Sequence, residues 1–464
     1  MSDGAGERFM SRRDAILWDL DRDPRFRAGV ASLLVLDREP DQDRFLEKME
    51  RITRLQPRLR QRVVESPVPF TPPRWLVDGG FDLAHHLRRV QVEAPGDLRA
   101  VLDVAATETA APFEPDRPQW RYTLCTGLSG GRAALLQVAH HAIADGLGGV
   151  ELAAEFFDAD RTGATPGPLP PAPEAEDLDR ISLTRDALEH VGRRSLAVVG
   201  GLTATAGSAL ARIGRDPVGS VRSGLAYASS ALRLMRPVNE TASPVMRGRS
   251  EDRRFDVIDF DFDALHRAAR TAGATVNDAF LTAISTGLGR YHEAHDAPVD
   301  GLRVTMPIST RSAVDPSASN RNDAARFELP VGADDIAGRL ARVHAVSSAM
   351  RREPALAAPG VVAGIIGLLP ARVTVPVMGS FMFHMDLLVS NVPGFPDSPY
   401  LCGARVEQWY LLGPTEGSAL AVTLLSHAGR SCVGITTDVA AVEDPDRLVA
   451  CLREGFESVL ALAG

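Results

Sequence analysis

Cysteine is scarce in this chain, and that scarcity excludes several classes of protein. The 464 residues contain four cysteines and no CxxC pair or other spacing typical of a zinc site. We therefore expect reduced, buried thiols in a reducing, cytoplasmic setting, with neither a disulfide framework nor a metal. The four residues are Cys125, Cys402, Cys432 and Cys451.

Long apolar runs are missing as well. The most apolar stretch, residues 355–385, is interrupted by three prolines and an arginine, so we expect no membrane span there. Residues 1–9 are polar and lack the apolar segment of a signal peptide.

Several functional signatures are also absent. The chain has no P-loop and no GxGxxG, and no serine lies in the strand-to-helix context of a nucleophile elbow, so nucleotide-binding folds and a serine hydrolase are not indicated. Its net charge of −9 argues against nucleic acid as the main partner, because phosphate binding requires a positive field.

The remaining composition is that of a globular protein of two domains. Hydrophobic residues make up 45% of the chain and charged residues 24%, and the length exceeds one ordinary core. Strand and helix patterns alternate in both halves, which predicts an α/β fold of two similar sandwiches that meet at an interface. Beside the hairpin described below, the expected strands lie at 30–36, 255–262, 304–308, 419–426 and 431–437, the last two joined by a turn, and the expected helices at 45–52, 263–271 and 276–288. We predict an N-terminal domain at 10–160, a linker at 161–250 and a C-terminal domain at 251–464.

The predicted linker has two parts. Residues 161–179 are rich in proline and glycine and have polyproline character. Residues 182–236 are expected to be helical and place arginines beside apolar residues. Two interpretations of this stretch stay open, namely a crossover packed against both domains and contact with an anionic membrane surface.

The most informative motif is HHxxxDG at residues 140–146. A hairpin with strands at 120–126 and 132–138 is expected to deliver the chain to His140, and a strand end is a stiff platform. A neutral imidazole suits the task of accepting a proton from an attacking hydroxyl. Consecutive side chains diverge, so one histidine should face substrate while the other packs. Asp145 could orient the imidazole or hold the loop through an arginine, and Gly146 permits a backbone that a Cβ would forbid.

Other interpretations of the motif remain open on residue chemistry alone. Both histidines could be structural. His141 and Asp145 could ligate a metal, although no third ligand is visible nearby. Acyl transfer with a histidine base is the leading interpretation.

Further segments accompany HHxxxDG along almost the whole chain. They are Ser11-Arg12-Arg13-Asp14-Ala15, Pro73-Arg74-Trp75, Phe81-Asp82-Leu83-Ala84-His85-His86, Arg117-Pro118-Gln119-Trp120, Val276-Asn277-Asp278-Ala279-Phe280-Leu281, Pro307-Ile308-Ser309-Thr310-Arg311 and Ser390-Asn391-Val392-Pro393-Gly394. With these segments the chain resembles the bacterial wax ester synthase/acyl-CoA:diacylglycerol acyltransferases. The combination is more specific than HHxxxDG, which is shared with chloramphenicol acetyltransferase and peptide-synthetase condensation domains.

The resemblance implies two chloramphenicol-acetyltransferase-like domains, joined by a helical crossover, with an active-site tunnel at their interface. His141 would be the general base, within a catalytic set that also includes His140, Asp145 and Asn277. Asp145 would point away from substrate and pair with an arginine, for which Arg60 is the candidate, and Gly146 would support the loop.

A second motif centres on Asn277. Thr275 and Asp278 are placed to form a capping box, which puts Asn277 in the first turn of a helix. Amide donors and the positive helix end there favour a developing oxyanion, although a cap or an interdomain hydrogen bond is an equal alternative. Four residues are expected to contact substrate: Trp120, Asp278, Ser309 and Ser390.

The implied function is acyl-CoA-dependent O-acyl transfer to diacylglycerol or a long-chain alcohol, giving triacylglycerol or wax esters. Acyl-CoA would be a co-substrate, and no metal or prosthetic group is expected. Peripheral contact with a membrane or lipid-droplet surface is expected, with no nucleic acid partner. Alternatives are a smaller, polyketide-type or peptide-type acceptor and a non-catalytic lipid-binding scaffold. One departure from the family pattern, Gln119 within Pro118-Gln119-Trp120, bears on acceptor choice.

Overall fold

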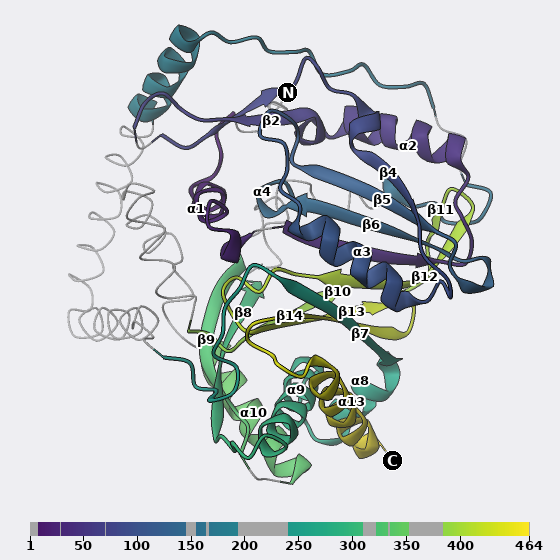
Figure 1. Ribbon diagram of the computed structural model, residues 1–464, viewed down its shortest axis with the longest axis vertical. Coiled ribbons are helices and arrows are strands. Elements are labelled where there is room, and N and C mark those ends of the chain that lie inside the picture. Colours follow the sequence, from purple (N-terminus) through teal and green to yellow (C-terminus); the bar gives the residue numbers. More distant parts are fainter. Residues whose placement is uncertain are drawn as a thin grey trace, which may run out of the picture.

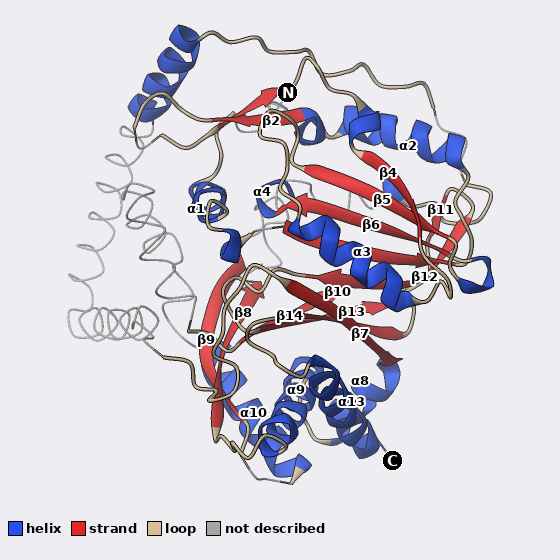
Figure 2. Cartoon of the chain, viewed as in Figure 1, coloured by secondary structure: helices blue, strands red, loops and turns tan. Residues whose placement is uncertain are grey.

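The computed structural model describes residues 8–27, 29–69, 71–144, 155–163, 167–193, 240–309, 322–332, 335–351 and 384–463. Two six-stranded mixed sheets lie one above the other, and helices cover their outer faces (Figures 1 and 2). This arrangement confirms the predicted α/β fold with two layered halves.

The N-terminal half follows the predicted pattern closely. The apolar run before residue 36 forms a strand, the helix with Phe45, Met49 and Ile52 ends just before Pro57, and the predicted hairpin is present. Its elements are α1 (Arg12–Leu20), η1 (Pro24–Phe26), β1 (Gly29–Leu36), α2 (Gln42–Leu55), η2 (Pro57–Arg60), β2 (Gln61–Val64), β3 (Arg74–Val77), η3 (Leu83–His85), β4 (Leu87–Gln91), α3 (Leu98–Ala110), β5 (Trp120–Thr126), η4 (Ser129–Gly131), β6 (Ala133–His140) and α4 (His141–Ala144).

The C-terminal half also matches the predicted strands and helices. Ala428 and Gly429, both at positive φ, turn β13 back into β14, which is the geometry of a tight hairpin. The elements are β7 (Arg253–Asp261), α8 (Phe262–Thr271), α9 (Val276–Glu293), β8 (Gly301–Ser309), β9 (Asn322–Pro330), α10 (Ile336–Arg351), β10 (Leu387–Pro393), β11 (Tyr400–Leu401), β12 (Ala404–Leu412), β13 (Leu420–His427), β14 (Arg430–Asp438), α13 (Pro445–Leu460) and η6 (Ala461–Ala463).

The two sheets do not divide at the predicted boundary. One sheet has the order β11-β12-β1-β6-β5-β4 and the other β7-β14-β13-β10-β8-β9. Strand β12 therefore leaves the C-terminal half and pairs antiparallel with β1, with Leu33 opposite Tyr410. The predicted C-terminal domain of 251–464 needs correction here, because residues 400–412 belong to the N-terminal sheet.

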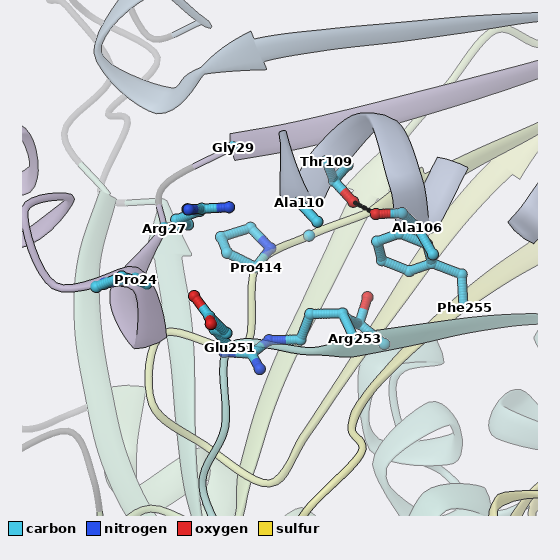
Figure 3. A pocket seen from close by; sticks show the side chains of 12 residues that line it. Pro24, Arg27, Gly29, Ala106, Thr109, Ala110, Glu251, Arg253, Phe255 and Pro414 are labelled. Carbon is cyan, nitrogen blue, oxygen red and sulfur yellow. Dashed lines mark hydrogen bonds between the residues drawn. The ribbon is translucent and has the colours of Figure 1, made fainter. Parts of the chain in front are cut away.

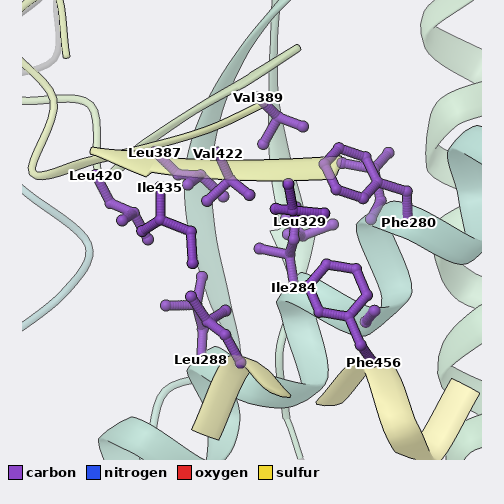
Figure 4. Packing of buried hydrophobic residues seen from close by; sticks show 14 of the residues in the cluster. Phe280, Ile284, Leu288, Leu329, Leu387, Val389, Leu420, Val422, Ile435 and Phe456 are labelled. Carbon is purple, nitrogen blue, oxygen red and sulfur yellow. The ribbon is translucent and has the colours of Figure 1, made fainter. Parts of the chain in front are cut away.

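Helices α8, α9 and α13 pack on the outer face of the C-terminal sheet and enclose its core (Figure 4). Phe280 and Ile284 of α9 meet Phe456 of α13 and the strand residues Val389 and Val422. Nearly every residue of α9 after its first turn is buried, so the helix that carries Asn277 is fixed by packing on several sides.

A separate apolar cluster joins the two halves. It includes Leu33 of β1, Val101 of α3, Phe255 of β7 and Tyr410 of β12. The sheets approach so closely that a Cβ built on Gly434 would lie 2.0 Å from the Leu411 carbonyl oxygen. Arg99 of α3 adds polar links, since it donates to the Phe255 carbonyl at 2.7 Å and pairs with Asp256 at 2.9 Å.

The described part of the proline-rich stretch, from residue 167 onward, contacts α2. Arg51 donates to the carbonyls of Gly167 and Pro168, both at 3.0 Å. A helix then spans 180–193, at the start of the stretch predicted to be helical. The rest of that prediction, residues 194–236, lies outside the described residues. Among the helices in the described ranges, none is long and apolar enough to cross a membrane.

Asp158 connects the segment that follows HHxxxDG to two neighbouring elements. Its carboxylate pairs with Lys48 of α2 at 2.8 Å and accepts from the Cys402 backbone N–H at 3.1 Å. One side chain thus joins α2, residues 155–163 and the strand pair β11–β12. All four cysteines are buried and free, as predicted.

We predict that Gly434→Ala destabilises the fold by about 1–3 kcal/mol, the usual cost of overpacking a closed interface. The new methyl would collide with backbone, which cannot rotate away. Urea unfolding measures the effect. Gly413→Ala is the matched control, because its Cβ would meet only Thr423 Oγ1 at 3.8 Å. Equal stability of both variants would contradict the close approach of the sheets.

Candidate active site

Strand β6 carries the chain to the two histidines, as the sequence predicts. His140 is its last residue, in register with Gly29 of β1, and its N–H donates to the Gln119 carbonyl at 2.9 Å. His141 opens the four-residue helix α4. Since β6 is an inner strand between β1 and β5, the position of this turn is rigidly set.

The structure separates the roles of the two histidines. His140 is 1% exposed, lies edge-on against Trp18 and accepts the Ala142 N–H on Nδ1 at 3.1 Å. With Nδ1 an acceptor, the neutral ring carries its proton on Nε2, which lies 4.0 Å from Asp21 Oδ1. Burial lowers the pKa of His140 to about 4, although the charge of Asp21 opposes the shift.

His141 is only half-buried. One histidine therefore packs and the other keeps access to solvent, which is the division expected from sequence. The packed ring is His140, which is 1% exposed and lies against Trp18, so this geometry gives no support to the prediction that it contacts substrate.

The acid and the glycine of the motif, Asp145 and Gly146, lie outside the described residues, so the pairing of Asp145 with Arg60 stays a prediction. Arg60 itself is buried. It donates to Glu50 Oε1 at 2.7 Å and to Thr53 Oγ1 at 3.0 Å, and its guanidinium lies 4.5 Å from the Phe81 ring centre.

Trp120 differs from its expected role in substrate contact. The ring is 1% exposed, stacks on His86 at 4.4 Å, and donates from Nε1 to the Leu59 carbonyl at 2.8 Å. These contacts make it an anchor between β5 and η2.

Its neighbour Gln119, the departure from the family pattern, is 4% exposed. Its Nε2 donates to the carbonyls of Glu114 and Arg117 at 2.7 and 2.6 Å. The glutamine thus folds the loop before β5, a local role that the family pattern alone does not indicate.

The predicted capping box on α9 is present. Thr275 Oγ1 accepts the Asp278 N–H at 3.2 Å, and the Asp278 carboxylate accepts the Thr275 N–H at 2.9 Å. Asn277 is half-buried in this first turn, and the one hydrogen bond recorded for its side-chain amide among the described residues is a weak donation to Met306 Sδ at 3.9 Å. A stronger acceptor could therefore replace the sulfur.

Asp278 differs from the expected substrate contact. Its side chain is 0% exposed. His344 of α10 binds Oδ2, and the Ser347 hydroxyl of the same helix binds Oδ1. Sequence reasoning missed both partners, because they lie 66 and 69 residues away from it. The only local signal was their spacing of three residues, which places them on one helix face.

The two serines expected at the substrate site lie on neighbouring strands. Ser309 ends β8, and its side chain lies outside the described atoms. Ser390 is half-buried in β10, in register with Thr423 of β13. Strands β8 and β10 run parallel, so Ser309 and Ser390 occur toward the same end of the sheet.

A small solvent-open cleft lies between the two halves. Residues from α3, from the start of β1, from β7 and from the loop after β12 surround it, and Arg27, Glu251 and Arg253 border it together with Pro414 (Figure 3). Gly29 of its wall is the register partner of His140, although neither histidine lines the cleft itself. The predicted continuous tunnel stays a prediction.

Comparison with known proteins agrees with this geometry. Residues 10–280 match the wax ester synthase/diacylglycerol acyltransferase catalytic domain, and residues 318–459 match the C-terminal domain of the same family. The chain belongs to this family. It is therefore an acyltransferase, as the sequence predicted.

Relatives cover nearly the whole chain. A putative diacylglycerol O-acyltransferase of Mycobacterium tuberculosis is 38% identical over 447 residues, which are 96% of this chain and 90% of that protein. Another from the same organism is 29% identical over 471 residues, covering 97% and 96%.

Solved structures share the fold at low identity. The wax ester synthase/diacylglycerol acyltransferase from Marinobacter aquaeolei VT8 aligns with a TM-score of 0.66 at 18% identity, over 99% of this chain and 100% of that one. The starter condensation domain of rhizomide synthetase, in complex with C8-CoA and Leu-SNAC, aligns at 0.57 and 13% identity, over 98% and 94%. These matches confirm the predicted two-domain, chloramphenicol-acetyltransferase-like fold.

We predict that His140 makes stability depend on pH. Its folded pKa of about 4 lies below the unfolded value of about 6.5, so the unfolded chain binds the extra proton in this range. The free energy of unfolding therefore falls as pH drops from about 6.5 toward about 4. His140→Asn, which retains an acceptor for the Ala142 N–H, should flatten the slope by up to about 1.4 kcal/mol per pH unit.

Urea unfolding across this pH range measures the slope, with His85→Asn at an exposed histidine as the control. Other buried histidines with lowered pKa values, His86, His292 and His427, will contribute a residual slope in the same direction. An unchanged slope in His140→Asn would show that His140 is not held neutral.

Proposed function

We propose that this chain transfers a fatty acyl group from acyl-CoA to the hydroxyl of diacylglycerol or a long-chain alcohol, giving triacylglycerol or a wax ester. The observation that carries the proposal is the division of the motif into a buried, neutral His140 and a half-buried His141 at a rigid strand end. The relative that is 38% identical over 96% of the chain is named as a putative diacylglycerol O-acyltransferase, which supports the choice of acceptor.

In this reaction His141 accepts the hydroxyl proton as the alcohol oxygen attacks the thioester carbonyl carbon. General-base help of this kind is worth about 10²–10⁴-fold in rate. The carbonyl π electrons move to oxygen, and the resulting oxyanion is stabilised by the Asn277 amide and the N-terminal end of α9. When the C–O double bond re-forms, the C–S bond breaks and the thiolate takes the proton from His141. Protons and charges balance without a covalent enzyme intermediate or a cofactor.

We further propose that the enzyme meets its lipid acceptor at a membrane or lipid-droplet surface. The helix at 180–193 exposes Ile181 by 79%, Leu188 by 57% and Val191 by 39%. Their spacing of seven and three residues places them along one face, and Arg180, Arg185 and Arg193 lie on the same helix. Apolar side chains flanked by cations are typical of a helix that binds an anionic interface.

We predict that His141→Ala abolishes turnover, with a loss of at least about 10²-fold in kcat because the base is gone. His140→Asn is the matched control and should retain most activity. The release of CoA thiol from palmitoyl-CoA can be followed colorimetrically with diacylglycerol or hexadecanol as acceptor. Burial raises the pKa of Cys125 to about 12 and of Cys402 and Cys432 to about 11, so the protein's own thiols add little background.

The same assay separates the acceptors. Thin-layer chromatography identifies triacylglycerol or wax ester as product. Thiol release only with small alcohols or amines would contradict the proposed acceptors, and no release with any acceptor would identify a non-catalytic scaffold. Retained turnover in folded His141→Ala would refute the assignment of His141 as the general base.

We predict that Ile181→Asp with Leu188→Asp weakens sedimentation with phosphatidylglycerol vesicles severalfold, since each change places a charge on the apolar face. CoA release with a soluble acceptor should be unchanged. Equal vesicle binding by the double variant and the wild type would exclude this helix face as the lipid contact.

A further inference from the structure

The buried carboxylate of Asp278 links α9 to α10 at the turn that carries Asn277. Asp278 Oδ2 lies 2.7 Å from His344 Nδ1 and accepts the Thr275 N–H at 2.9 Å, while Oδ1 is bound by the Ser347 hydroxyl. Arg351 follows on the same helix, with Nη2 3.9 Å from Oδ1. A single side chain therefore receives donors from its own helix cap and from two consecutive turns of α10.

These donors are needed because the carboxylate is fully shielded from water. Asp278 is 0% exposed, and an ion removed from water is strongly destabilised unless hydrogen bonds replace its hydration. Burial tends to raise the pKa of Asp278, but the hydrogen bonds from Ser347, His344 and Thr275 outweigh it and hold that pKa below its usual value. The carboxylate is ionised at neutral pH, so each charged bond is of the stronger kind.

The link acts on the first turn of α9 through the capping box. If a donor on α10 is lost, the ionised carboxylate must turn toward another partner or bind a proton. Either response weakens its bond to the Thr275 N–H and loosens the turn. Asn277 lies between Thr275 and Asp278 in that turn, and within the described part of the chain its amide makes one hydrogen bond, the weak contact with Met306 Sδ. Its direction therefore depends on the geometry of the capping box.

We propose that His344 and Ser347 of α10 are positioning residues that act through Asp278 to aim the Asn277 amide at the oxyanion. The proposal rests on the function proposed above. It adds that α10, more than 60 residues further along the chain, sets the rate of the chemical step while leaving substrate binding almost unchanged. A misplacement of about 1 Å at a reacting centre can lower a rate by about 10²-fold, so small rotations of the turn suffice.

The first test is a kinetic comparison of single variants. Ser347→Ala and His344→Phe should each lower kcat by about tenfold, with KM within about twofold, because they affect a transition-state contact. His344→Asn should restore most of kcat, since the asparagine amide nitrogen can occupy the place of Nδ1. Ser348→Ala, one residue further along the same helix, is the matched control and should behave as wild type.

The second test is a double-mutant cycle with Asn277→Ala. If Ser347 acts through Asn277, adding Ser347→Ala to Asn277→Ala should change kcat by less than about twofold, because the two residues form one chain of contacts. Losses that multiply, or a fall in kcat for Ser348→Ala equal to that of Ser347→Ala, would overturn the proposal. So would an unchanged kcat in both Ser347→Ala and His344→Phe.

Circular dichroism melting of each variant separates a folding defect from a positioning defect, and His344→Phe serves if Ser347→Ala does not fold. The outcomes also separate this inference from the proposed function. Full activity in Asn277→Ala would refute the role of Asn277 in the oxyanion site. A large loss in Asn277→Ala combined with multiplying losses in the cycle would refute only the positioning role of α10.

Discussion

The pairing of β12 with β1 is the constraint on which the arrangement of this protein depends. It places a C-terminal strand beside the strand that pairs with β6, so the two histidines are registered against both halves of the chain. At Gly434 the second sheet lies in close contact with Leu411 of the first. An active site built from residues of both halves requires such a fixed interface, because a hinge between independent domains would not hold its groups within the small tolerance that catalysis demands.

A buried imidazole in the N-terminal half and a buried carboxylate in the C-terminal half each fix the position of a neighbouring residue. His140 fills the core as a neutral ring and leaves His141 accessible. In the C-terminal half, the Asp278 carboxylate is buried and is stabilised by several hydrogen-bond donors. In our proposal these bonds hold in place the N-terminal end of α9, which faces the acyl carbonyl. In both places a fully enclosed polar group fixes the geometry of a neighbour that is only partly enclosed.

Much of this organisation follows from sequence, because local signals suffice for it. An apolar, β-rich run predicted β1, helical spacing predicted α2, turns between apolar runs predicted the β5–β6 and β13–β14 hairpins, and the Thr275/Asp278 spacing predicted the capping box. Contacts between distant segments could not be derived in this way. The position of β12 in the N-terminal sheet depends on the pairing of Leu33 with Tyr410, which are far apart in the sequence. The roles of Trp120 and Asp278 likewise depend on distant partners, such as Leu59 and His344. The motif residues were found, but whether each faces substrate or core is decided by tertiary packing.

The ion pair between Lys48 and Asp158 has a practical consequence for chemical modification. Residue 48 is the only lysine in the sequence, and its ammonium is tied to a carboxylate with the side chain only 17% exposed. Every other basic side chain that carries a permanent charge is an arginine, which does not react with amine-directed reagents. Acylating labels, crosslinkers and lysine-modifying enzymes thus meet one shielded side-chain amine, and its reaction would report directly on the opening of the contact between α2 and the segment after the HHxxxDG motif.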